Sequence, residues 1–462
     1  MATRIDQGRY RTSDQLGRRT SSRTAAARSA YVWRGTNLVH TLYFKLLLLL
    51  APIQSILLTP VQGSTPAFLL ILSAAAILLR GEARYGRVLM FILGFWLIYI
   101  LYMMFSLSGY LINEPDFGAV RTIRDVYVYG ILRQTQVTQG LYLFVAMLFG
   151  FLVYTYFQEA FVKFAYFGII LLAMYGFYEF TFYAIFHANG DILSNRNFGD
   201  LDTAAAGAGD SAGAGSFATG SALQGSNLFG AGFMRLKSLV GEPSMYALSV
   251  TPFAVYAYAR RWWFLFALLA LSLVLSTSST AVIGLIVGLA YAEIRQRQEF
   301  ILYIAGALVV CVMLYMTSDP VHQALNTLLF DKLDTVSGNE RMMLFTNSVE
   351  LIFDGNVVRA LFGVGFGTIR STDMFSNLLA NIGIIGLLCY SALLLAPCFM
   401  LRKASDRDAI VATLVSLYVM EMATVAEFAY LPPWFMIALA YVRVREQRHP
   451  TLAAPGRAMA GV

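Results

Sequence analysis

Apolar blocks alternate with polar segments along almost the whole chain. They lie at about 38–58, 66–80, 88–111, 140–157, 161–187, 243–259, 262–277, 279–294, 300–317, 375–400, 408–426 and 430–443. Blocks near the length of a membrane span favour spanning helices over buried core helices. We therefore expect an all-α polytopic membrane protein with about twelve transmembrane helices, the last of them the shortest.

The composition supports this class. The 462 residues are 58% hydrophobic and 13% charged, whereas soluble chains are about 45–50% apolar and about 25% charged. The net charge of +7 lies in short segments beside the apolar blocks, which encodes membrane orientation rather than nucleic-acid binding. The cysteines lie in apolar segments and the histidines lack metal-ligand spacing. We expect no cofactor, no metal and no nucleic-acid partner.

The polar remainder predicts two tails and three long loops. Residues 1–37 are rich in arginine and too polar to form a core, which predicts a disordered cytoplasmic tail. A transmembrane domain would cover 38–443, and a second cytoplasmic tail 444–462. The long loops are about 112–139, 188–242 and 318–374. Within the second, residues 199–232 are rich in Gly, Ala and Ser, which is typical of a flexible spacer or a mobile flap.

The short loops predict the orientation. With the N-terminus inside and alternating spans, one side receives the basic residues Arg80, Arg84, Arg87, Lys163, Arg260, Arg261, Arg295, Arg297, Arg402, Lys403, Arg407, Arg443, Arg445 and Arg448. The positive-inside rule then places both termini in the cytoplasm and the long loops outside.

The outer loops nevertheless carry cations, against this bias. They are Arg121, Arg124, Arg133, Arg196, Arg235, Lys237, Lys332, Arg341, Arg359 and Arg370. Two interpretations stay open. The cations pair with loop acids such as Glu114 and Asp354, or they converge on one face of the membrane and hold an anionic substrate.

The stretch 233–247, FMRLKSLVGEPSMYA, leads from the flexible loop into an apolar block. Pro243 suits the first turn of a helix, which puts Glu242 at its cap. Glu242 either only caps this helix or acts as a base, with Arg235 and Lys237 binding an anionic group.

The stretch 334–394 combines a polar segment, a glycine-rich turn and a long apolar helix. Residues 341–353 have the spacing of an amphipathic helix on the outer membrane surface, with its apolar face at Met342, Phe345, Val349 and Ile352 and a turn or cap at 337–339. Arg341 would grip phosphate oxygens at the headgroup level. The turn 363–367, GVGFG, allows close backbone approach but lacks the lysine of a nucleotide-binding P-loop. Asp373, Asn377 and Asn381 would face the same outer space.

Two further features leave alternatives open. The hydroxyls of residues 276–280, STSST, contact a sugar or phosphate, or they only satisfy the backbone at a turn. Glu179, Glu421 and Glu427 lie in or at the ends of apolar blocks, where acids are costly and suggest function. They could pair with the outer arginines or relay protons in a transporter.

These motifs, in this order, resemble the O-antigen ligase / Wzy-type polysaccharide polymerase superfamily. The segment SGNERMMLFTNSVELIFDGNVVRALFGVGFGTI, followed by FSNLLANIGIIGLLCYSALL, supplies the loop arginine (Arg341), the G-V-G-F-G turn, a polar Ser-Asn pair at 376–377 and the G-I-I-G helix at 383–386. GEPSMYA also resembles the E-P-S segment of some exopolysaccharide polymerases. The likeness covers about 150 residues, from Phe233 to Leu394.

The chain departs from that family pattern at two points. Ligases usually have a histidine before the loop asparagine, whereas this chain has none near Asn377, which favours a polymerase. Many members carry an arginine just after the Ser-rich hairpin. This chain has none there, so Arg235 or Lys237 would substitute.

The resemblance implies a GT-C-like helical fold and metal-independent glycosyl transfer on the periplasmic face of a bacterial inner membrane. Donor and acceptor would be oligosaccharides linked to undecaprenyl diphosphate, with a chain-length regulator and a flippase as further partners. Arg341, Glu242 and Asp373 are the expected catalytic residues. The residues expected to bind substrate are Arg235, Lys237, Arg370, Arg121, Arg124 and Asn377. A ligase and, from another class, a secondary transporter are the alternatives, although no internal repeat favours the latter.

Overall fold

The computed structural model describes residues 38–59, 63–78, 85–118, 120–123, 133–196, 225–228, 231–318, 336–402 and 406–448. The predicted tail 1–37, most of the loop 199–232, and Arg124 lie outside these ranges.

A helix occupies each of the twelve predicted apolar blocks. These helices are α2 (Leu38–Leu50), α3 (Pro66–Leu78), α4 (Tyr85–Ile112), α5 (Gln134–Tyr156), α6 (Ala160–Phe186), α8 (Pro243–Ala259), α9 (Trp263–Ser276), α10 (Ser279–Gln296), α11 (Phe300–Thr317), α15 (Met374–Met400), α16 (Arg407–Thr424) and α17 (Leu431–Arg448). The loops contribute β1 (Gly225–Leu228), β2 (Ala231–Met234), the short helix η1 (Ser238–Val240), α13 (Val336–Phe353) and α14 (Val357–Phe362). The prediction of a helical protein is confirmed, with one antiparallel hairpin, β1–β2, in the described part of the chain.

Four of these helices, α4, α5, α6 and α15, are long and apolar enough to cross a bilayer. On α4, large apolar side chains such as Met90 (71% exposed) and Leu111 (75% exposed) face away from the protein. An exposed apolar surface of this extent would be unfavourable in water and suits hydrocarbon. These four helices indicate a membrane protein. The count of twelve membrane spans stays a prediction.

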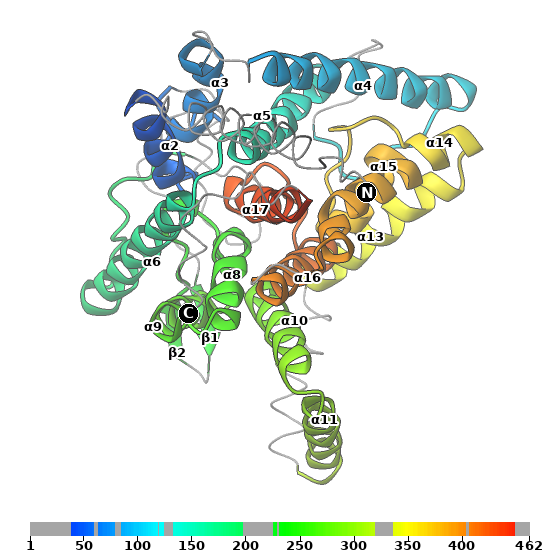
Figure 1. The fold of residues 1–462 in the computed structure, drawn as a ribbon. Coiled ribbons are helices and arrows are strands. Elements are labelled where there is room, and N and C mark those ends of the chain that lie inside the picture. Colours follow the sequence, from blue (N-terminus) through cyan, green and yellow to red (C-terminus); the bar gives the residue numbers. More distant parts are fainter. Residues whose placement is uncertain are drawn as a thin grey trace, which may run out of the picture.

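Helix α17 forms the centre of the molecule, with α5, α8, α15 and α16 packed against it (Figure 1). Both α8 and α17 are buried along most of their length, as expected of helices that are apolar on all sides. Helices α13 and α14 lie along α15, and α14 packs against α4. Helix α11 extends away from the other helices at the bottom of Figure 1 and contacts α10.

The glycine-rich turn packs against a break in α15. Helix α15 is interrupted at Gly383 (φ 62°), and Gly363 (φ 71°) faces this break. A Cβ on Gly363 would lie 2.4 Å from the carbonyl carbon of Asn381, and one on Gly383 would lie 2.5 Å from that of Leu361. Only glycine allows two backbones to approach so closely with a positive φ. The predicted close backbone approach is confirmed, and here it joins backbone to backbone.

The structure corrects two predicted boundaries. Residues 337–339 lie inside α13, which begins at Val336, and do not form a turn before it. A glycine inside a helix costs only about 1 kcal/mol, so Gly338 does not stop the helix. At the other end, residues 444–448 belong to α17 and not to a tail. The predicted apolar face of α13 is also split. Leu344, Leu351 and Ile352 are buried, whereas Met342 is 61% exposed.

Candidate functional site

Arg235 lies on the segment that connects β2 to α8. Its Nε donates to the carbonyl oxygen of Ser276 (3.3 Å) and to Oγ1 of Thr277 (3.2 Å) at the end of α9. The backbone N–H of Leu236 donates to the carbonyl of Leu275 in the same turn (3.1 Å). The guanidinium therefore lies at the Ser-rich hairpin, where the resembling family carries an arginine of its own. The hairpin hydroxyl of Thr277 positions this cation.

Lys237 contacts different residues from those that Arg235 contacts. Its side chain is fully buried, with Nζ 4.0 Å from Oδ2 of Asp191, and it interacts electrostatically with Glu179 of α6. An ammonium group enclosed by two carboxylates is not presented to a substrate. The expectation that Lys237 binds substrate is therefore not supported, because burial and pairing give it a structural role.

Glu242 occupies the N-cap position of α8 with Pro243 as the first helical residue, as predicted. Its side chain makes no capping hydrogen bond to the helix. It accepts instead from the hydroxyl of Ser244 and remains partly exposed. Glu242 is therefore the N-cap residue of α8, but its carboxylate hydrogen-bonds Ser244 and not the helix backbone.

Glu242, on the same connection, and Arg341, on α13, both act electrostatically on Arg235. Burial lowers the pKa of Arg235, the nearby positive charge of Arg341 lowers it further, and Glu242 raises it. Arg341 itself is exposed on α13. Arg235 is therefore influenced by one negatively and one positively charged side chain in addition to its burial.

Glu427 extends the site from the other side, in the connection between α16 and α17. Arg196, Arg370 and Glu242 all act on its carboxylate, and its Oε1 accepts from the N–H of Ala429 (2.8 Å). Burial raises the pKa of Glu427 and Glu242 adds to the rise, whereas Ala429, Arg196 and Arg370 oppose it. A carboxyl of this kind holds a proton at a higher pH than an ordinary glutamate does.

We call this set the arginine cluster. It consists of Arg196, Arg235, Glu242, Arg341, Arg370 and Glu427. Electrostatic interactions link these four guanidinium groups and two carboxylates, from segments that are as much as 231 positions apart in the chain (196 to 427). Arg370 and Arg341 are exposed, and in the described part of the chain neither forms a side-chain ion pair. Such a cluster can bind a polyanion such as a diphosphate.

Arg196 and Glu427 are the residues that the expected site set lacked. Arg196 was one of ten loop cations, with no motif around it. Its backbone N–H donates to the carbonyl of Ser55 (3.0 Å) and its Nη1 to that of Gln54 (3.2 Å), so it is held by the segment that follows α2. Glu427 was expected to pair with outer arginines or to relay protons. In the structure its carboxylate accepts a hydrogen bond from the N–H of Ala429, and Arg196 and Arg370 act on it electrostatically.

Asp373 and Asn377 organise the chain around the glycine-rich turn. Asp373 is 8% exposed and is the N-cap residue of α15. Its two carboxylate oxygens accept from the N–H (2.8 Å) and the hydroxyl (2.7 Å) of Ser376. Asn377 is buried, and its Oδ1 accepts from Asn381 Nδ2 (3.1 Å). Asn381 in turn holds the backbone of Thr368 and Ile369. These contacts account for both expected site residues as structural ones.

Arg121 lies beside the arginine cluster through its backbone. Its carbonyl accepts from the N–H of Arg370 (2.9 Å), within a short antiparallel bridge between Thr122 and Ile369. Arg124, the other expected cation of this loop, lies outside the described residues. The bridge fixes the segment that carries Arg370 and gives Arg121 a supporting position.

The other acids of the apolar blocks have protein neighbours. Glu421 is buried in α16, and its Oε2 accepts from the hydroxyl of Tyr390 on α15 (2.8 Å). Glu179 is fully buried near Lys237. Neither belongs to the arginine cluster.

A comparison of the chain with protein-family models gives no match, and a comparison with curated proteins gives none either.

Proposed function

We propose that this protein is a polymerase of lipid-linked oligosaccharide repeat units, and hence a glycosyltransferase. The observation that carries the proposal is the arginine cluster, in which electrostatic interactions link four guanidinium groups and two carboxylates of the described residues. Guanidinium groups bind phosphate oxygens in a bidentate fork, and an excess of them suits a diphosphate leaving group. The motif order that resembles the Wzy-type polymerases supports the same reaction.

The proposal includes a setting in the membrane. The twelve helices would span a bacterial inner membrane in a GT-C-like arrangement, with both termini in the cytoplasm and the arginine cluster on the periplasmic side. Lys163 lies at the start of α6, and Arg196 follows the end of the same helix. A helix of 27 residues spans about 40 Å at 1.5 Å per residue, which is long enough to cross a bilayer. The proposed setting therefore puts Lys163 on the cytoplasmic side and Arg196 on the periplasmic side.

In the proposed reaction, a hydroxyl oxygen of the acceptor repeat unit attacks the anomeric carbon of the donor glycan. The bond between this carbon and the diphosphate oxygen breaks, and undecaprenyl diphosphate leaves with the electron pair. Glu242 takes the proton of the attacking hydroxyl, and Glu427 is the second carboxylate within reach. Arg341 and Arg235 stabilise the negative charge that grows on the diphosphate, while Arg196 and Arg370 hold its remaining oxygens.

The decisive experiment is the glycan length in cells that lack the gene and are complemented at matched membrane levels. Wild type should restore long polymer, whereas Arg341→Ala should reduce polymerisation by about 100-fold or more, the range for removal of one transition-state donor. Arg341→Lys should recover only part, because a lysine cannot form the bidentate fork. Arg402→Ala is the matched control, since Arg402 is exposed but lies outside the cluster.

Three outcomes would overturn the proposal. Long polymer in the absence of the gene contradicts a polymerase. If this polymer then fails to reach its final acceptor, a ligase is the better assignment. Full activity of Arg341→Ala removes the cluster from the reaction, and the transporter interpretation with Glu421 and Glu427 would then be tested by ion-coupled uptake.

A further inference from the structure

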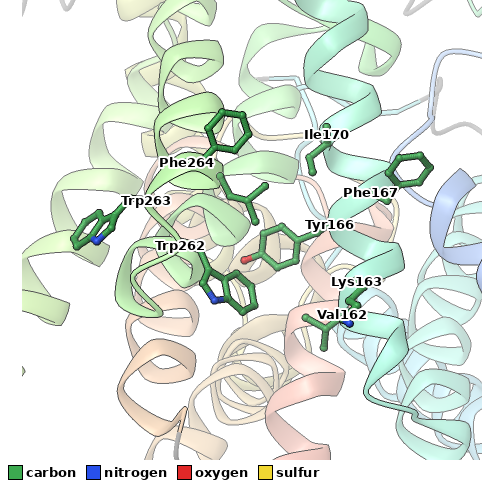
Figure 2. Close-up of a pocket in the computed structure, with 9 residues that line it drawn as sticks. Val162, Lys163, Tyr166, Phe167, Ile170, Trp262, Trp263 and Phe264 are labelled. Carbon is green, nitrogen blue, oxygen red and sulfur yellow. The ribbon is translucent and has the colours of Figure 1, made fainter.

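A cavity of about 570 Å³ lies between α6 and the turn from α8 to α9, apart from the arginine cluster. Its walls are apolar or aromatic and come from Val162, Tyr166, Phe167, Ile170, Phe264 and Leu265. Lys163 and Trp262 lie together toward one end, whereas Ile170 and Phe264 lie toward the other (Figure 2). A volume of this order is typical of sites that bind small molecules.

The aromatic end of the cavity is rigid. The rings of Tyr166 and Trp262 meet edge to face, with centroids 5.3 Å apart, and Trp262 also contacts Tyr256. The backbone of the turn fixes Trp262, since its N–H donates to the carbonyl of Ala257 (2.8 Å). The Tyr166 hydroxyl is already used, because it donates to the carbonyl of Phe253 (2.9 Å). The tyrosine therefore contributes a ring surface and no polar contact.

Two cations adjoin this end. Lys163 lines the cavity and is exposed. The guanidinium carbon of Arg260 lies 5.9 Å from the centroid of the Trp262 ring. The nearest acid in the sequence, Glu159, is bound to Arg443, which contacts both of its carboxylate oxygens. Two basic side chains thus adjoin the aromatic end of the cavity, and the carboxylate of Glu159 is bound by Arg443.

The opposite end opens toward the surroundings of the protein. Phe167 is 50% exposed and Phe264 is 79% exposed. In a membrane protein, such side chains lie against acyl chains, while tryptophan and basic residues gather at the headgroup level. The cavity thus has an apolar part that suits an acyl chain and an aromatic end with basic neighbours that suits an anionic headgroup.

We propose that the cavity between α6 and the α8–α9 turn binds an anionic phospholipid of the cytoplasmic leaflet. One acyl chain lies along Ile170, Phe167 and Phe264, and the phosphate lies between Lys163 and Arg260. This site is separate from the proposed glycosyl transfer, because its residues lie at the start of α6 and the arginine cluster lies beyond the end of that helix.

The test is native mass spectrometry of the full-length protein in detergent with equimolar phosphatidylglycerol and phosphatidylcholine of identical acyl chains. Wild type should retain one phosphatidylglycerol in preference to phosphatidylcholine. Lys163→Gln/Arg260→Gln should bind it about 30-fold more weakly, since each basic residue contributes about 1 kcal/mol. Arg295→Gln/Arg297→Gln removes the same charge from exposed positions outside the cavity and should leave retention unchanged.

A second measurement locates the lipid. Phosphatidylglycerol with brominated acyl chains should quench the fluorescence of Trp262 and Trp263, and an excess of inorganic phosphate should not relieve the quenching. Equal retention of both lipids by wild type, or equal retention of phosphatidylglycerol by the Lys163/Arg260 double variant and wild type, would overturn the proposal. Relief of quenching by phosphate would do the same, because it indicates a site for the free anion.

Discussion

Two groups of arginines and carboxylates in the described part of this protein differ in how closely their charges are paired. Arg443 at the end of α17 is 4% exposed and binds Glu159 (2.7 Å), Asp406 (2.9 Å) and Glu446 (2.8 Å). We call these four residues the Arg443 network. In the arginine cluster, electrostatic interactions link four guanidinium groups and two carboxylates of the described residues.

The difference separates stabilising cations from binding cations. A buried cation that already has its carboxylates gains nothing from a further anion, whereas an exposed and under-compensated one does. Lys237 shows that closeness in sequence is no guide, since it is neutralised by Asp191 and Glu179 although it is two residues from Arg235. The comparison predicts that changes to compensated cations reduce stability, and that changes to the cluster reduce activity.

The largest expected loss of stability follows Lys237→Met. This variant would leave Glu179 fully buried with neither carboxylate oxygen hydrogen-bonded in the described structure, and breaking a buried pair costs about 3–5 kcal/mol. Arg235→Met, two residues away, should keep the stability of wild type and lose polymerisation. Thermal unfolding in detergent and glycan length measure the two effects.

A second variant keeps the Lys237 prediction open to refutation. Glu179→Gln in the Lys237→Met background should recover part of the unfolding temperature, because a neutral amide needs no compensating cation. Asp191 retains its own donors, the Tyr175 hydroxyl (3.0 Å) and the Ser194 N–H (3.0 Å). If Lys237→Met unfolds at the wild-type temperature, the buried pair does not stabilise the protein and the comparison fails.

Arg443→Met should lower the free energy of unfolding by less than Lys237→Met does. The expected loss is about 3 kcal/mol, at the lower end of the range for a broken buried pair. The Asp406 side chain is 4% exposed, but that of Glu159 is 50% exposed and that of Glu446 is 22% exposed, so water can solvate two of the three carboxylates. The unfolding temperature should fall, while polymer length at matched protein level should stay normal. A loss of polymer without a loss of stability would contradict the assignment of Arg443 as a stabilising residue, and Arg402→Met serves as the control.

The helices could be predicted from the sequence because their signal is local. A long apolar block specifies a helix by composition alone, and all twelve blocks became helices. The mutual approach of two backbones at Gly363 and Gly383 was visible as a glycine motif. The sequence did not show that Gly363 packs against the break at Gly383, because these two positions are twenty residues apart.

The candidate site was predicted only in part because it depends on side-chain direction and on long-range packing. In an extended strand, Arg235 and Lys237 would point to one side. The strand ends at Met234, and Lys237 precedes a short helix with Ser238 at φ 54°, so the alternation is lost. Asp373 and Asn377 have polar side chains that suit either catalysis or capping, and only the observed hydrogen bonds assign them to the backbone.

The smallest change in stability is expected for Glu427→Gln. The sign of this change distinguishes a cluster that binds an anion from a stabilising network such as the Arg443 network. Burial raises the pKa of Glu427 in the folded protein above its ordinary value of about 4.3. Between these two pKa values the folded state binds more protons than the unfolded state, so the free energy of unfolding falls as the pH rises through this window. Glu427→Gln should therefore raise the unfolding temperature at neutral pH, and the gain should vanish at pH values below about 4, where both forms are neutral. Glu350→Gln, at an exposed position of α13, is the control and should change little. If Glu427→Gln instead destabilises the protein at neutral pH, the carboxylate is a compensated partner of Arg196 and Arg370, and the arginine cluster resembles the Arg443 network after all.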